Sequence, residues 1–280
     1  MNPEHRHAAL PGERDLPASD PPLQTIALGG QQIAYADEGP RDAFPVIATH
    51  GLPGSHRDYR YIAPQLTDAV RLIRVDMPGF GETPFAAWPR TAQRDRAHFL
   101  DRFARELQLK RYGLMAHSMV AGAVIEAAAM YPERVTRVIG VAGVGASRHR
   151  GYGFSPVTYR LIAMALRVPI LQQSILRETR AQYEKRGFPG ARELDLATAR
   201  LHMDLVTGMN FDAVRRLAPR LRARVLLCYA DDDHLVEAAI GRELNGLFPS
   251  SELHVYDGAS HALQKTRAPE IGELIKQFVG

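Results

Sequence analysis

The sequence predicts an α/β fold, with a mainly parallel, doubly wound sheet and an inserted helical cap. Short apolar runs bounded by Gly and Pro turns alternate with segments of helical spacing along most of the chain. Because these runs are apolar throughout, they are typical of strands that helices cover on both faces. At 280 residues the chain has a length that α/β folds reach as one domain.

The expected strands and helices follow one another in a regular order. A hairpin opens the series, because 23–28 and 32–36 flank the turn residues Gly29 and Gly30. Further strands are predicted at 45–49, 70–75, 112–116, 135–144, 224–229 and 252–256. Helical patterns occupy 91–107, 119–130, 236–247 and about 268–278.

The alternation lapses between 147 and 216, where helical segments at 159–166 and 171–185 follow one another. A long helical excursion between two strands indicates a cap inserted over the carboxyl edge of the sheet. We therefore expect a core formed by 23–146 and 217–280, and a cap formed by 147–216. Residues 1–22 are rich in Pro, Ala and charge and show no period, so a mobile leader is expected there.

The composition argues against nucleic-acid binding and against a membrane span. The net charge is +4, but most arginines have an acid nearby in the sequence and no block of five like charges occurs. We interpret this as a slightly basic solvated surface. The most apolar stretches, 119–130 and 161–171, are interrupted by Glu126 and Arg167. Both are shorter than the roughly 18–20 residues that a bilayer crossing needs.

The cellular setting is predicted from the cysteine content and the N-terminus. The single cysteine, Cys228, lies in an apolar run and has no cysteine with which to form an internal disulfide. No apolar stretch follows the charges at the N-terminus as in a secretory signal. We expect a soluble, cytoplasmic protein that acts on a small molecule, and the sequence leaves the oligomeric state open.

Ser118 stands between a predicted strand and a predicted helix, in the segment Leu-Met-Ala-His-Ser-Met-Val-Ala-Gly of 114–122. A sharp strand-to-helix turn exposes such a hydroxyl at the top of the sheet. The alternative is a serine that only caps the following helix. The segment resembles the nucleophile elbow of the α/β-hydrolase family, G-x-S-x-G, although Ala116 and Val120 stand where the family usually has glycine. The β-branched Val120 is the larger departure.

Two further loops resemble the same family. The segment His-Gly-Leu-Pro-Gly of 50–54 resembles its H-G-x-P-G turn. That resemblance implies an oxyanion hole formed by the backbone N–H groups of Leu52 and Met119. The alternative is a tight turn that merely needs Gly and Pro. The segment 76–81 resembles the D-x-P-G-x-G loop, which is structural in the family.

Three consecutive aspartates follow the strand predicted at 224–229. The segment 229–236 resembles the acid loop of the family, and its register selects Asp233 as the orienting acid. An aspartate in this role holds the tautomer of the catalytic base and stabilises the imidazolium that forms during attack. Asp232 remains the alternative, because a shift by one residue is open.

The base is predicted to be His261, in a loop after the last strand that resembles the terminal G-x-x-H loop of the family. The fold expects the chain order Ser, Asp, His. His234 adjoins the acid, and His254 lies inside a predicted strand. His117 is adjacent to Ser118 and is poorly placed to turn back to its hydroxyl.

A serine nucleophile predicts a serine hydrolase of the carboxylesterase type, which cleaves an ester-like bond through an acyl-enzyme. Carboxylic esters, lactones and thioesters of small apolar molecules are the expected substrates. The alternatives are hydrolysis of a C–C bond in a vinylogous diketone, or a non-catalytic homologue that only binds ligands. No metal-ligand spacing, phosphate-binding loop or dinucleotide fingerprint occurs in the sequence, so no cofactor and no metal are expected.

The predicted cap supplies candidate substrate contacts. They are Tyr152, Tyr159, Tyr183, Leu161, Ile162, Ala165, Leu166, Ile170, Leu171 and Ile175. These side chains predict an apolar acyl or aryl pocket, and the alternative is that they only pack the cap onto the core.

Overall fold

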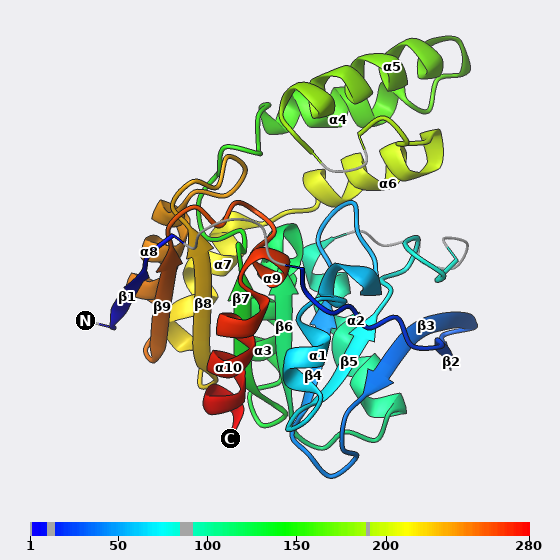
Figure 1. Ribbon diagram of the computed structural model, residues 1–280. Coiled ribbons are helices and arrows are strands. Elements are labelled where there is room, and N and C mark those ends of the chain that lie inside the picture. Colours follow the sequence, from blue (N-terminus) through cyan, green and yellow to red (C-terminus); the bar gives the residue numbers. More distant parts are fainter. Residues whose placement is uncertain (1, 10–14, 85–91, 189–190) are drawn as a thin grey trace.

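The computed structural model describes residues 2–9, 15–84, 92–188 and 191–280, and its sheet confirms the predicted α/β class (Figure 1). Within this part of the chain, nine strands form one sheet in the order β1-β9-β8-β7-β6-β4-β5-β3-β2. Their bounds are β1 Glu4–His7, β2 Gln24–Leu28, β3 Gln31–Glu38, β4 Pro45–Thr49, β5 Arg71–Val75, β6 Tyr112–His117, β7 Val135–Val141, β8 Arg224–Ala230 and β9 Ser251–Tyr256. Only the pairs that involve β3 are antiparallel.

Helices cover both faces of the sheet, as strands that are apolar throughout require. One face carries α2 (Gln93–Glu106), α3 (Ala121–Met130), α7 (Phe211–Leu217) and α8 (Ala238–Leu247). The other carries α1 (Ala63–Leu66), α9 (Leu263–Thr266) and α10 (Ala268–Val279). Two apolar cores result, one on each face of the sheet, and the central strands lie between them.

Three helices between β7 and β8 stand apart from the sheet. They are α4 (Pro156–Ala165), α5 (Pro169–Lys185) and α6 (Leu196–Thr207), and they pack against one another in a separate layer above the sheet (Figure 1). Helix α7 belongs to the same stretch of sequence but packs against α3, next to the sheet. The helical stretch thus divides into an outlying layer and one helix that covers the sheet.

The N-terminal segment differs from the expected mobile leader, because Glu4–His7 forms the edge strand β1 beside β9. Leu253 N–H donates to Pro3 O at 3.0 Å, and Asp257 N–H donates to His7 O at 2.8 Å. The strand is polar on both sides, so hydrophobic periodicity gives no sign of it. Backbone pairing, which leaves no mark on the sequence pattern, holds it in place.

No helix in the described part of the chain is long and apolar enough to cross a membrane.

Candidate active site

Ser118 lies at a sharp turn between β6 and α3. It begins the short 3₁₀ turn Ser118–Val120 directly after the strand, with a φ of 57°. A non-glycine residue in this left-handed region is strained and needs surrounding contacts to hold it. One such contact is the hydrogen bond that Val144 N–H donates to Ser118 O at 3.0 Å. The turn presents the hydroxyl at the carboxyl end of β6, where it borders a cavity.

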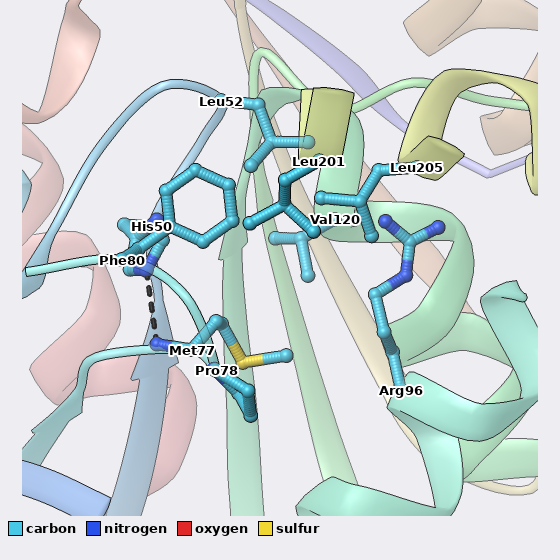
Figure 2. Close-up of a pocket in the computed structure, with 9 residues that line it drawn as sticks. All are labelled: His50, Leu52, Met77, Pro78, Phe80, Arg96, Val120, Leu201 and Leu205. Atoms are coloured by element: carbon cyan, nitrogen blue, oxygen red, sulfur yellow. Dashed lines mark hydrogen bonds between the residues drawn. The ribbon is translucent and has the colours of Figure 1, made fainter. Parts of the chain in front are cut away.

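The turn forms although Ala116 and Val120 replace glycines of the family motif. Ala116 is buried opposite Gly140 of β7, where the neighbouring residue has no side chain to oppose it. Val120 is buried and borders a small cavity that Leu52 and Leu201 also line, so its branched side chain faces empty space (Figure 2). The two departures are therefore compatible with the sharp turn.

His261 lies between Ser118 and Asp233, in the loop after β9. Its Nε2 is 3.0 Å from Ser118 Oγ, and its Nδ1 is 2.7 Å from Asp233 Oδ2. When Nδ1–H donates to the carboxylate, Nε2 carries the lone pair that faces the hydroxyl. The structure thus brings the three side chains into one hydrogen-bonded chain, although they come from loops that follow three different strands.

The neighbouring aspartates have different partners. Asp233 is fully buried, and its Oδ1 accepts from Leu235 N–H at 2.8 Å and from Val236 N–H at 3.0 Å. Burial alone would raise the pKa of Asp233, but the hydrogen bond from His261 and these backbone donors bring that pKa below its usual range. Asp232 instead accepts from the backbone N–H groups of Ala259 and Ser260, each at 2.9 Å.

Burial lowers the pKa of His261 below its usual range. The hydrogen bond to Asp233 acts in the opposite direction, while charges on His117 and His234 lower the pKa further. At neutral pH the imidazole is therefore unprotonated, as a general base must be.

The two residues expected to supply the oxyanion donors are both found next to the cavity at Ser118. Leu52 and Met119 border the same cavity as the Ser118 hydroxyl. The loop that carries Leu52 approaches closely because of Gly51: a Cβ there would lie 2.8 Å from His117 Nδ1 and 3.3 Å from Ser118 Cβ. A side chain at this position would push the loop away from the turn.

Sequence reasoning missed two residues that hold this loop. His50 accepts from Met77 N–H at Nε2 (3.0 Å), and its Nδ1 is 2.7 Å from Gly51 O. Asp58 accepts from Gly51 N–H at 3.1 Å. His50 stands within the motif, whose fixed histidine could have signalled such a role. Asp58 ends the S-x-x-D capping box that begins at Ser55, a pattern that indicates the start of a helical turn but not a contact with Gly51.

A cavity of about 420 Å³ opens above Ser118. Besides the residues around Ser118, it is lined from the helical stretch by Tyr152, Tyr159, Tyr183, Phe188, His202, Val206 and Met209. The three tyrosines expected to contact substrate therefore do border it. The seven aliphatic residues expected beside them are not among its described lining residues, and Leu161, Ile170 and Leu171 are exposed.

Leu52 also lines a second, smaller cavity, and Arg96 forms part of the wall of this cavity (Figure 2). Its apolar lining comes from Met77, Phe80, Val120, Leu201 and Leu205, among others. Arg96 is buried, and its Nε and Nη2 have no hydrogen-bond partner among the described residues. Burial lowers the pKa of Arg96 to about 10, against the opposing effect of Glu126, so the guanidinium is charged at neutral pH.

The fold and this loop arrangement together define an α/β hydrolase. The chain belongs to the family described as "Alpha/beta hydrolase of unknown function (DUF1057)", whose model matches residues 34–276.

Two named relatives have low sequence identity to this chain but align with it over most of their length. The chain is 24% identical to 2-hydroxymuconate semialdehyde hydrolase of Pseudomonas sp. (strain CF600), over 95% of this chain and 96% of the relative. It is 25% identical to haloalkane dehalogenase of Psychrobacter cryohalolentis, over 89% and 87%. Among solved structures, meta-cleavage product hydrolase from Pseudomonas fluorescens IP01 matches with a TM-score of 0.67 and 21% identity, covering 91% of this chain and 96% of that one. At such identities the structural match establishes the fold and not the reaction.

The balance of charges around His261 gives a prediction that needs no substrate. The electrostatic effect of His117 lowers the pKa of His261, so that pKa should rise in His117→Ala. Asp233 raises the pKa of His261, so that pKa should fall in Asp233→Asn. An NMR titration of the His261 ring signals between pH 4 and pH 8 measures both shifts. His98→Ala, which removes a hydrogen bond to Tyr131 on another part of the molecule, serves as the control. Shifts of the opposite sign would contradict this account.

Proposed function

We propose that the chain is a serine hydrolase that cleaves a carboxylic ester, lactone or thioester of a small apolar substrate through an acyl-enzyme. The observation that carries the proposal is the continuous hydrogen-bonded chain from Asp233 through His261 to Ser118. Family membership supports hydrolysis in general, and the serine supports the acyl-enzyme in particular.

The geometry supports a stepwise mechanism. Ser118 Oγ attacks the carbonyl carbon while His261 Nε2 takes its proton, and Asp233 stabilises the imidazolium. The backbone N–H groups of Leu52 and Met119 stabilise the oxyanion, which is typically worth about 2.7–4 kcal/mol for one donor. The imidazolium then gives its proton to the leaving oxygen or sulfur. A water molecule, deprotonated by the same imidazole, attacks the acyl-enzyme. The bond between the acyl carbon and Ser118 Oγ then breaks, the imidazolium returns the proton to Oγ, and the acid leaves.

Under this proposal, the helical stretch 147–216 determines which substrates bind. We assign 147–216 as the cap on the core of 23–146 and 217–280, with α4, α5 and α6 as its outlying layer. The cavity above Ser118 is bounded by core loops on one side and by tyrosines and apolar residues of this stretch on the other. Its size, about 420 Å³, suits a small apolar molecule.

Removal of the nucleophile tests the acyl-enzyme. Wild-type protein should release p-nitrophenol from p-nitrophenyl butyrate with an initial burst, and a fluorophosphonate label should map to Ser118 by mass spectrometry. Ser118→Ala and His261→Ala should each lower kcat/KM by about 10⁴- to 10⁶-fold, because such residues act as a unit. Ser174→Ala, an exposed serine on α5, is the matched control.

Two outcomes would contradict the proposal. Absence of a burst and of labelling across several esters would favour a protein that only binds ligands. Retention of most activity by His261→Ala would show that another group is the base.

The two aspartates allow a matched comparison. Asp233→Asn should lower kcat by about 10⁴-fold, since the amide favours the wrong tautomer of His261. Asp232→Asn should cost far less, because the amide oxygen can still accept from Ala259 and Ser260 N–H. Steady-state rates on the same ester measure both, and the reverse order would identify Asp232 as the orienting acid.

One observation favours C–C bond hydrolysis as a second candidate. The guanidinium of Arg96 lies beside the cavity behind Leu52 and has no hydrogen-bond partner for two of its nitrogens among the described residues (Figure 2). A substrate carboxylate would supply the missing acceptor. Dienedioate-type vinylogous diketones carry such a group, and relatives named for acting on a semialdehyde and on a meta-cleavage product belong to the same fold.

Arg96→Met separates the two candidates. If the guanidinium binds a substrate carboxylate, the variant should lose about 10- to 100-fold in kcat/KM on a dienedioate-type substrate, the range of a charged hydrogen bond. Turnover of neutral p-nitrophenyl butyrate should stay within about threefold under the same principle. Arg94→Met, at an exposed position of the same helix, is the control. Equal loss on both substrates would show that Arg96 only supports the fold.

A further inference from the structure

The edge of the sheet brings two histidine-bearing strands together. Strands β1 and β9 pair in parallel, and the register places His5 beside His254. Residues two apart in a strand share a face, so His7 lies on the same face as His5, and Glu252 on the same face as His254. Figure 1 shows β1 beside β9 at the edge of the sheet. The pairing of these strands therefore gathers three imidazoles and a carboxylate at one place.

The side chains lie close enough to share one ion. His5, Glu252 and His254 each offer one ligand atom, and these atoms lie within 4.8 Å of one another. Glu252 Oε2 is 3.9 Å from His254 Nε2. The rings of His5 and His254 are stacked, with centroids 4.7 Å apart. None of these residues belongs to the site around Ser118.

The buried nitrogen of His254 points to a missing ligand. Its side chain is only 7% exposed, and Nε2 has no hydrogen-bond partner among the described residues. Its Nδ1 is 2.9 Å from His7 Nε2. In the tautomer in which Nδ1–H donates to His7, the Nε2 lone pair faces the Glu252 carboxylate. A cation between these two acceptors would satisfy the buried Nε2 and the partly buried carboxylate together.

We propose that His5, Glu252 and His254 form a binding site for a divalent transition metal such as Zn²⁺. Two imidazoles and a carboxylate are a ligand set that Zn²⁺ accepts, with water in the fourth position. His7 orients His254 through the other ring nitrogen, as outer partners of metal-bound histidines do. Zinc ligands lie about 2.0–2.2 Å from the metal, so exposed His5 and part-buried Glu252 rotate inward on binding.

Such a site would join the ends of the chain. The N-terminal strand is at the edge of the sheet, and β9 is its one strand neighbour within the described residues. A metal held by both strands adds a bridge between them and stabilises β1 against opening. Spacing along the sequence could not reveal it, because the two ligand histidines come from opposite ends of the chain.

Zinc titration of the full-length chain without an affinity tag tests the site. After removal of metals with a chelator, isothermal titration with ZnCl₂ should show one site per chain. His5→Ala, Glu252→Gln and His254→Phe should each weaken binding at least about tenfold, and His7→Phe by a similar factor through loss of orientation. His98→Ala, a histidine outside this group, should bind as wild type does.

Hydrogen exchange gives a second readout that is independent of affinity. Zn²⁺ at a concentration that just fills the wild-type site should slow amide exchange in β1 of the wild type and slow it clearly less in His5→Ala. His5 is exposed, so this variant keeps the test decisive even if His254→Phe fails to fold. Absence of zinc binding, equal affinity in His5→Ala and His98→Ala, or unchanged exchange in zinc-saturated wild type would each overturn the proposal.

Discussion

The left-handed conformation of Ser118 is the constraint on which the arrangement around it depends. A serine at φ of 57° persists only where neighbouring groups leave it no better conformation. In the family motif, glycines at the positions of Ala116 and Val120 allow neighbouring segments to approach this turn closely. In this chain, glycines at other positions allow the close approach. Gly51 allows the Leu52 loop to touch the turn, and a Cβ on Gly143 would lie 2.8 Å from Ala121 Cβ.

Buried charge is the second determinant of the site. Asp233 is fully buried and yet has a lowered pKa, because two backbone N–H groups and His261 together offset the cost of burial. The loop that carries His261 is in turn bound by Asp232 through two backbone N–H groups. The two adjacent carboxylates thus have different partners: Asp233 contacts the imidazole of His261, and Asp232 binds the backbone of the loop that carries His261.

Much of the fold and of the candidate site could be predicted from the sequence. The same reasons explain why strand β1 and the buried position of Arg96 could not. The central strands and helices carry strong hydrophobic periodicity, and Ser118 and His261 each follow a recognisable strand. The polar strand β1 has no such pattern. The choice between Asp232 and Asp233 depends on the conformation of the turn after β8, because moving the family motif by one residue along the sequence would exchange the roles of these two side chains. The buried position of Arg96 depends on helix packing from distant segments, which local sequence does not encode.

The division between sheet and inserted helices suggests how such a chain could change substrate without losing its chemistry. The groups around Ser118 are held by loops at the ends of strands and by hydrogen bonds within the core, such as those of His50 and Asp58. The cavity wall opposite them comes largely from the stretch between β7 and β8, where α4, α5 and α6 pack against one another. Substitutions of the cavity-lining residues in that stretch alter the shape of the cavity while the hydrogen-bonded chain from Asp233 to Ser118 keeps its support. The distant relatives, which share the fold and differ in the reactions for which they are named, are consistent with this separation.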